Sequence, residues 1–321
     1  MRTANAVQKV KVPKNRLPAR KKNNIVKRFW KTRFLFALFL PALIYYIMFK
    51  YVPMWGVLIG FYRYNVIGGL QASKFIGLMN FAVFFKTPQW FDYVKNTFAL
   101  GFQSLMISFP LTILFSLLLN ELRNMKFKRV VQTVSYLPHF LSTVVVVALM
   151  RTLCDPTTGA INLIIKALGG KSIYFFTRSE WFRPLYLISE IWAGLGWSTI
   201  IYLSAISSVD PGLYEAARLD GAGRWRQMWN ITLPSIAPTV STMFIMRVGN
   251  LLDDSMVKVL LMQEPVTYET SQTLSTYIYE IGMGGNYGAS TAVDLLASLV
   301  NLCFLFAANF VSKKLTENSI F

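Results

Sequence analysis

Residues 96–120 read NTFALGFQSLMISFPLTILFSLLLN, a run of 25 residues without one charged side chain. A hydrocarbon core about 30 Å thick is crossed by a helix of about 20 mostly apolar residues. An open strand could not pair its backbone groups in lipid, whereas a helix pairs them within itself. This stretch therefore predicts a transmembrane helix and makes the chain a membrane protein.

Five further stretches are long and apolar enough to cross a bilayer, and we expect all six to be helices. A shorter apolar piece, 53–62, is interrupted by Pro53 and is expected to lie along the membrane surface. The expected fold class is an all-α membrane protein with six transmembrane helices. The other five spans are residues 34–51, 130–150, 184–209, 235–262 and 288–312.

The overall composition excludes several classes of protein. The 321 residues are 54% apolar and 15% charged, while 33 Lys and Arg against 15 Asp and Glu give a formal net charge of +18. So apolar a chain is neither disordered nor a soluble nucleic-acid binder. Two cysteines, Cys154 and Cys303, cannot form a disulfide scaffold, and with a single histidine they make no metal site. We expect neither a bound metal nor a nucleic-acid partner.

The positive charge is concentrated at the start of the chain, where residues 1–33 contain twelve Lys or Arg and no acid. Such a segment can recognise nucleic acid or lipid headgroups, but before an apolar span it is more typical of a flank that stays in the cytoplasm. With six spans, the segments on that side hold 21 Lys and Arg against 10 on the other. We expect a basic cytoplasmic segment at 1–33, a single membrane domain at 34–321, and both termini inside.

One loop differs from the other connections. Residues 209–234 read VDPGLYEAARLDGAGRWRQMWNITLP, between the fourth and fifth spans. Asp210 can cap a short helix that begins at Pro211, and Gly221 can end it. A second short helix is expected over 224–230. The pattern predicts a helix–glycine–helix knuckle on the cytoplasmic face that exposes Glu215.

This loop resembles the signature loop of importer-type ABC permeases, E-A-A-x3-G-x9-I-x-L-P. Every position and both spacings match, from Glu215 through Gly221 to Pro234. Shorter segments resemble carbohydrate-uptake permeases, in particular the polysaccharide and complex-oligosaccharide branch related to maltose permease. These segments are IGLMNF at 76–81, LPHF at 137–140, TGAIN at 158–162, NYGA at 286–289 and the tail at 313–321.

The resemblance implies a six-span type I importer permease in the cytoplasmic membrane of a bacterium, which takes up an oligosaccharide. Its implied partners are a second homologous permease, two ATP-binding subunits and an extracellular solute-binding protein. The loop would couple the permease to the ATPase subunits, which bind ATP and Mg²⁺, and this chain itself would hold no cofactor. The coupling residues would be Glu215, Ala216, Ala217, Asp220, Gly221, Ile231, Leu233 and Pro234.

The sequence contains no phosphate-binding motif of its own. Gly170-Lys171-Ser172 resembles the end of a Walker A motif, but Ile165 occupies the position of the required first glycine. We therefore expect a non-catalytic subunit that takes its energy from a partner.

Ionisable side chains within the expected spans are candidates for the transport pathway, because a charge at the bilayer centre costs about 3 kcal/mol and usually faces protein or water. Arg247 and Asp254 are seven residues apart, which would place them on one face of a helix. Asp254 and Lys258 form an i,i+4 pair that can satisfy itself. Pathway or heterodimer contact and internal pairing both remain open. The candidates are Glu190, Arg247, Asp253 and Asp254, with Lys258 and Asp294 nearer the outer interface.

A sugar pathway also needs aromatic faces and hydrogen-bonding groups, because sugar rings stack through their C–H faces and their hydroxyls need donors and acceptors. Aromatic side chains in membrane helices are more often packing residues, and His139 after Pro138 is more typical of a helix break than of a ligand. The candidates at inner-to-middle depth are Tyr136, His139, Trp192, Trp197 and Asn250.

Two other functions are alternatives. An ion-coupled secondary carrier could use Asp253, Asp254 or Asp294 as proton or sodium sites, but such carriers usually contain internal repeats, and none is evident. The adjacent acids Asp253 and Asp254 nevertheless depart from the pattern expected of the permease branch, where we expect at most one acid. A membrane enzyme would need a nucleophile with a base, a metal cluster or a cofactor loop, and the sequence supports none of these.

Overall fold

The computed structural model describes residues 25–316. Most of the basic segment and the end of the tail, residues 1–24 and 317–321, lie outside the described residues. The chain divides into two compact units, residues 1–56 and residues 57–321.

The described part of the first unit is a single helical stretch. Helix α1 (Ile25–Tyr46) continues through a π-helical turn (Ile47–Tyr51) into a 3₁₀ helix (Val52–Phe61). Pro53 therefore does not interrupt the helix, and the separate surface piece expected at 53–62 is wrong. The changed hydrogen-bond pattern on either side of Val52 accommodates the missing N–H of proline. The side chains of residues 34–55 are all exposed, as expected of a surface that lipid or another subunit covers.

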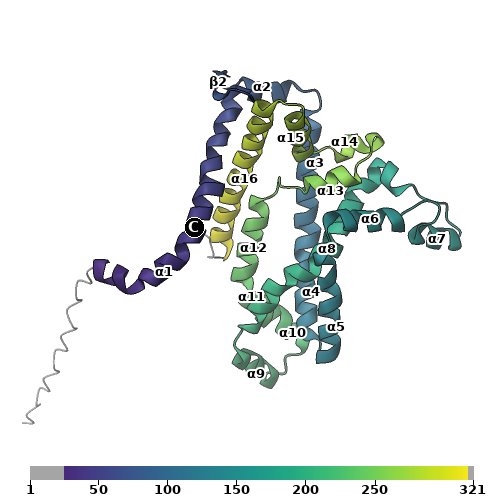
Figure 1. Cartoon of the computed structure of the whole chain (residues 1–321). Coiled ribbons are helices and arrows are strands. Elements are labelled where there is room, and N and C mark those ends of the chain that lie inside the picture. The colour runs from purple at the N-terminus through teal and green to yellow at the C-terminus, as the bar shows by residue number, and fades with distance from the viewer. Residues whose placement is uncertain (1–24, 317–321) are drawn as a thin grey trace, which may run out of the picture. The chain divides into compact units, whose positions relative to one another are not determined.

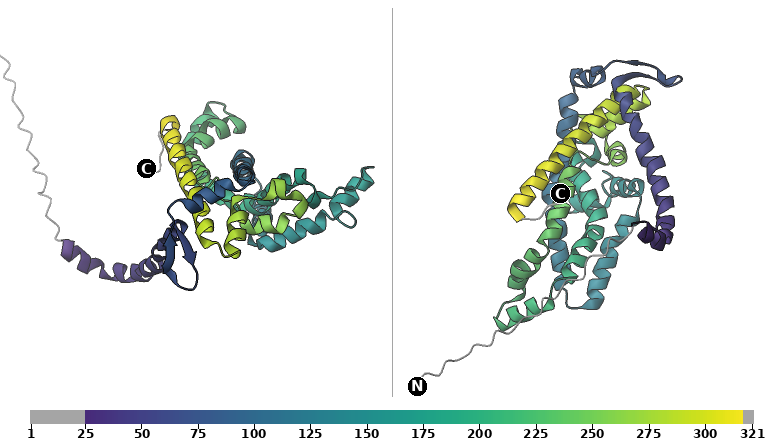
Figure 2. Two further views of the ribbon diagram at one scale, coloured as in Figure 1. Left: turned by 90° about the horizontal axis from the view of Figure 1, so that it is seen from above. Right: turned by 90° about the vertical axis from the view of Figure 1, so that its left-hand side faces the viewer.

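A short β-hairpin follows, which the all-α expectation did not include. Strands β1 (Tyr62–Asn65) and β2 (Gly69–Phe75) are antiparallel, and Tyr62 pairs with Phe75 (Figure 2). The turn forms because the Asn65 side chain accepts hydrogen bonds from the N–H groups of Ile67 and Gly68, both at 3.0 Å. Helix α2 (Met79–Lys86) comes next.

The second and sixth expected spans are confirmed as long apolar helices. Helix α3 (Trp90–Gln103), a π-helical turn (Ser104–Ser108) and α4 (Phe109–Glu121) form one span of 32 residues. Helix α16 (Tyr287–Thr316) covers the sixth, and α8 (Ser179–Ser207) covers the fourth with 29 residues. In the described part of the chain, three helices are long and apolar enough to cross a membrane: Thr32–Phe61, Trp90–Glu121 and Tyr287–Lys314. The number rises to five if the bent pairs within 125–153 and 224–249 are each one span. The number six stays a prediction.

The third expected span is not one helix. Helix α5 (Met125–Tyr136) passes into a 3₁₀ turn (Leu137–Phe140) and then α6 (Thr143–Leu153), with a bend of 105°. Pro138 cannot donate a backbone hydrogen bond, and Ser142 starts a new helix by accepting from the N–H of Val145. The continuous helix expected over 130–150 is therefore wrong.

The fifth expected span is also broken. Helix α12 (Ala237–Gly249) ends before Asn250, and the next helix, α13 (Met256–Met262), is capped by Ser255. Between them the Leu252 N–H donates to the Asn301 side chain of α16 at 3.0 Å, which satisfies backbone that a helix would otherwise pair. The continuous helix expected over 235–262 is wrong.

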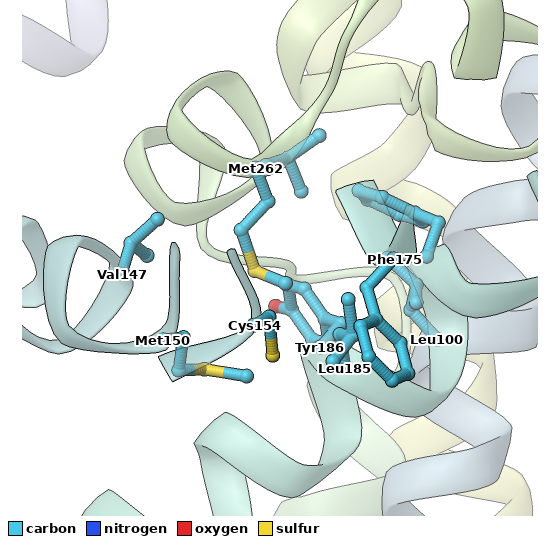
Figure 3. Packing of buried hydrophobic residues seen from close by; sticks show 10 residues of the cluster. Leu100, Val147, Met150, Cys154, Phe175, Leu185, Tyr186 and Met262 are labelled. Carbon is cyan, nitrogen blue, oxygen red and sulfur yellow. The ribbon is translucent and has the colours of Figure 1, made fainter. Parts of the chain in front are cut away.

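A buried apolar cluster joins four of these helices. Leu100 of α3, Val147 of α6, Tyr186 of α8 and Val259 of α13 are all buried in it (Figure 3). Helices α4 and α5 lie against α8, and α12 lies along α16 (Figure 1). Dispersion contacts across this cluster hold the second piece of each broken span, α6 and α13, against α3 and α8. The remaining helices are α7 (Ala160–Ala167), α9 (Pro211–Leu219), α10 (Arg224–Gln227), α11 (Leu233–Ser235), α14 (Tyr268–Ser271) and α15 (Leu274–Met283), with 3₁₀ turns at Phe175–Thr177 and Pro265–Thr267.

Candidate translocation pathway and coupling loop

Helix α9 has the boundaries that the sequence predicts. The Asp210 carboxylate accepts from the Gly212 N–H at 2.9 Å, and Pro211 is the first helical residue. At the other end Gly221 has a φ of +75°. The N–H of Ala222 bonds to the carbonyl of Ala217 at 2.8 Å. This C-terminal motif needs a left-handed residue, which glycine adopts without a steric penalty.

The second half of the loop fastens it to the membrane helices. After α10 the chain forms a π-helical turn (Met228–Thr232) that leads into α11. Met228 is 1% exposed and packs with Leu117 of α4 and Ile206 of α8. The hydroxyls of Tyr214 and Thr232 lie 3.0 Å apart and connect α9 to this turn. A displacement of α9 would therefore be transmitted to α4 and α8.

The outer surface of the loop is exposed. Glu215, Ala216 and Asp220 are exposed and Ala217 is half-buried, while Ile231 and Leu233 are half-buried in the second part and Pro234 is exposed. Two large apolar side chains also face outward, because Leu219 is 90% and Trp225 65% exposed. Within its unit, the loop lies at the end opposite the β-hairpin (Figure 1). Apolar exposure at a rigid knuckle is typical of a protein-binding surface.

A polar cavity of about 350 Å³ lies where the fifth span breaks, and we call it the polar cavity. It brings together six of the candidate residues with charged or amide side chains, and residues that the sequence did not indicate. Discontinuous helices that line a cavity are where membrane transporters bind polar substrates. Its lining is Leu100, Gly101, Ser104, Tyr186, Glu190, Arg247, Asn250, Leu251, Asp253, Asp254, Ser255 and Lys258.

An ion pair lies at one end of this cavity. Arg247 of α12 donates to the carboxylate of Glu190 on α8 and to the hydroxyl of Ser104. The Ser104 hydroxyl donates in turn to Glu190 at 2.5 Å. Ser104 begins the π-helical turn after α3, and such turns are frequent at functional sites. The three groups satisfy one another, so Glu190 and Arg247 pair with each other across two helices.

The acidic residues of the broken segment do not make the contacts predicted from sequence. Because α12 ends at Gly249, Arg247 and Asp254 do not share a helical face, contrary to the prediction. Asp253 accepts from the Asn301 amide at 3.0 Å. The expected Asp254–Lys258 pair is absent from the described residues, and the Lys258 ammonium instead lies 4.2 Å from the ring centroid of Tyr186.

A second cavity of about 600 Å³, the aromatic cavity, lies along α8 beyond the ion pair. Its lining includes Phe109, Trp197 and Tyr202 with the hydroxyl groups of Ser108, Thr112 and Ser198. Trp197 stacks on His139 with ring centroids 4.5 Å apart and an interplanar angle of 5°. His139 therefore supports a cavity residue from the bend of the third span, and it does not line the cavity itself.

Three candidates lie elsewhere. Trp192 lines a separate apolar groove between α5 and α8, and neither Tyr136 nor Asp294 lines the polar or the aromatic cavity. Ser104 and Tyr186 also line the polar cavity but could not be predicted from the sequence, because uncharged side chains in an apolar span carry no signal of their own. No group of three or more His, Cys, Asp or Glu side chains among residues 25–316 could hold a metal ion.

Helices with apolar surfaces, an interior polar cavity at a broken span and an exposed knuckle at one end define a membrane transport component. Residues 108–317 match the family described as binding-protein-dependent transport system inner membrane component. The polygalacturonan/rhamnogalacturonan transport system permease protein YteP of Bacillus subtilis (strain 168) is 42% identical over 302 residues, 94% of each chain. Protein LplB of the same strain is 39% identical over 91% of this chain and 92% of its own.

Solved structures agree with these sequence relatives. A chain of a bacterial alginate ABC transporter, in complex with an alginate pentasaccharide-bound periplasmic protein, matches with a TM-score of 0.83 and 37% identity over 92% of this chain and 99% of its own. A second alginate ABC transporter structure matches equally, with 38% identity over 91% of this chain. The chain belongs to the family of binding-protein-dependent transport system inner membrane components. The alternative of an ion-coupled carrier receives no support from these relatives.

Proposed function

We propose that this permease subunit imports an oligosaccharide with the energy of ATP that partner subunits hydrolyse. The proposal assigns the loop at 209–234 to the ATPase contact and the two cavities to the sugar path. Its relatives carry names of permeases for polygalacturonan and rhamnogalacturonan and of an alginate transporter, which supports a polysaccharide-derived substrate. Chemically, hydroxyl-rich lining groups and stacking faces in the cavities suit a sugar.

The observation that carries the coupling role is the way the loop is held. Glu215 and Ala216 are exposed on α9, while Met228 anchors the same loop between α4 and α8. A partner that moves α9 therefore moves the helices that line the cavities. Alternating access requires such a rigid connection between the energy source and the path.

Partners and orientation follow from this assignment. A second homologous permease would complete the path, two ATP-binding subunits that hold ATP and Mg²⁺ would contact the loop, and an external solute-binding protein would deliver the sugar. The loop end then faces the cytoplasm of a bacterium and the β-hairpin end faces outward. The excess of Lys and Arg in the segments on the loop side supports this orientation.

Replacement of Gly221 by alanine tests the coupling role in the assembled transporter. A non-glycine residue in the left-handed region costs about 1–2 kcal/mol, so the end of α9 should shift. We expect ATPase stimulation by the loaded binding protein to fall about tenfold or more, which corresponds to about 1.4 kcal/mol of lost coupling. Glu215→Ala should act in the same direction.

A matched control is Glu180→Ala, because Glu180 is an exposed acid at the start of α8 that makes only a 3.5 Å contact with Arg178. That variant should keep normal stimulation. ATPase activity that responds normally in both loop variants, with complexes assembled at normal yield, would refute the coupling assignment.

A further inference from the structure

The polar and aromatic cavities share two side chains and no others. Glu190 of α8 and Arg247 of α12 line both, whereas every other lining residue belongs to one cavity alone. The ion pair that these two residues form is therefore the boundary between two open spaces. Their side chains are 22% and 44% exposed, so they are accessible from the cavities.

The cavities follow each other along the same helices. On α8, Tyr186 lines the polar cavity and Tyr202 lines the aromatic cavity. At 1.5 Å per helical residue, these positions are about 24 Å apart along the axis. Glu190 lies between them in sequence. The order on the span Trp90–Glu121 is the same, because Leu100 lines the first cavity and Thr112 the second.

The pair also connects three helical segments. Arg247 is on α12, Glu190 on α8, and Ser104 at the π-helical turn between α3 and α4. Hydrogen bonds between charged groups are stronger than neutral ones, and more so away from water. While these bonds persist, α8 and α12 cannot separate at this level, and the two spaces remain divided.

We propose that Glu190 and Arg247, with Ser104, form an internal gate of the sugar path. Closed, the gate divides the polar cavity from the aromatic cavity; open, it joins them into one path along α8. Sugar hydroxyls both donate and accept hydrogen bonds, so a passing saccharide can bond the carboxylate and the guanidinium that the open gate leaves unpaired. This inference rests on the proposed transport function.

The test measures access across the gate with single cysteines. Asn250 lines the polar cavity and Ser198 the aromatic cavity, and both residues are exposed. Each is replaced by cysteine in a Cys303→Ser background, in the assembled complex within right-side-out vesicles. A membrane-impermeant methanethiosulfonate is added from outside. We expect it to react quickly with the cysteine at position 250 and slowly with the one at position 198.

Arg247→Gln should open the gate. We expect the reaction rate at position 198 to rise about tenfold or more, which corresponds to about 1.4 kcal/mol, and the rate at position 250 to stay unchanged. Glu190→Gln and Ser104→Ala should also raise the reaction rate at position 198. The double exchange Glu190→Arg with Arg247→Glu should restore slow reaction, because it rebuilds the pair with opposite polarity.

The control is Arg151→Gln, which removes another ion pair of similar exposure. Arg151 bonds Glu264 at 2.8 Å, and neither residue lines the two cavities. Reagents of opposite charge are both used, because a local change in potential alone would change their rates in opposite directions.

The gate proposal would be overturned if the reaction rate at position 198 were the same with and without the ion pair, in complexes that assemble normally. It would also be overturned if Arg151→Gln raised that rate by the same factor. If the complex with Arg247→Gln does not assemble, the Ser104→Ala variant decides the test, because it removes one neutral hydroxyl and leaves both charges. Failure of coupling in the Gly221 experiment would leave these rates unaffected, so the two proposals fail separately.

Discussion

At the scale of single residues, Asn162 shows how one amide organises a loop. It is completely buried, its Nδ2 donates to the carbonyls of Cys154, Asp155 and Ile173 at 3.0 to 3.1 Å, and its Oδ1 accepts from the Ile173 N–H at 2.7 Å. The sequence marks it only through the TGAIN resemblance, which assigns it no role. Its function here is to satisfy backbone groups between α6 and the turn before α8.

Replacement of Asn162 by alanine should destabilise the protein. The carbonyls of Cys154 and Ile173 and the Ile173 N–H would lose the partner that Asn162 provides, and each unsatisfied buried group costs about 1–3 kcal/mol. We expect a clear fall in the thermal unfolding midpoint of the purified complex. Gln89→Ala is the control, because Gln89 is exposed and its side chain makes no capping bond; an equal fall there would show that burial is not the cause.

At the scale of elements, the break in the fifth span depends on a glycine in another helix. A Cβ added to Gly101 of α3 would lie 1.9 Å from the carbonyl oxygen of Leu251 and 2.9 Å from its carbonyl carbon. Atoms do not approach so closely, so only glycine lets α3 pass beside the irregular backbone. The close contact holds residues 250–255 at the wall of the polar cavity.

Gly101→Ala should therefore displace the broken segment. Overpacking typically costs about 1–3 kcal/mol, and a clash with backbone belongs to the upper part of that range. We expect a lower unfolding midpoint in the same thermal assay. Gly194→Ala provides the comparison, because nothing lies within 4 Å of its added Cβ on α8; helix propensity should make that variant neutral or slightly more stable. Similar losses in both would contradict the packing argument.

At the scale of the whole molecule, the exposed apolar surface and the charge distribution define how the protein lies in the membrane. The side chains of residues 34–55 are all exposed, and the second unit also exposes large apolar side chains such as Phe310 and Leu299. Lipid or another subunit can cover these side chains. The charge bias predicts that the hairpin faces outward and the loop at 209–234 faces the cytoplasm.

Single-cysteine labelling checks this orientation. Ile67 at the hairpin tip is 100% exposed and Trp225 in the loop is 65% exposed. In a Cys303→Ser background, an impermeant thiol reagent outside intact cells should label Ile67→Cys and leave Trp225→Cys unlabelled until the membrane is opened. The reverse pattern would invert the orientation and with it the assignment of the loop to a cytoplasmic ATPase.

The loop at 209–234 and the second and sixth spans follow from sequence because their determinants are local. An uncharged run of 25 residues has only one stable form in lipid, and Asp210, Pro211 and Gly221 set the ends of α9 through bonds to neighbours fewer than six residues away. The charged and amide candidates could be selected from sequence for the same reason, because the cost of a buried charge does not depend on the fold; their role in transport stays a prediction. Six of them, Glu190, Arg247, Asn250, Asp253, Asp254 and Lys258, line the polar cavity.

The partners of those residues were decided only by the tertiary structure. Glu190 and Arg247 are 57 residues apart in the sequence, and Ser104 precedes Glu190 by 86 residues. No spacing along the chain could therefore reveal that these residues pair. The break in the fifth span depends on the same kind of distant contact, since the Asn301 side chain bonds the Leu252 N–H and Gly101 leaves room for the Leu251 carbonyl. Local sequence determined that this chain crosses a membrane and where helix α9 of the loop at 209–234 begins and ends. Packing between distant helices determined which residues meet around the two cavities, because the backbone left unpaired where the fifth span breaks is satisfied by another helix.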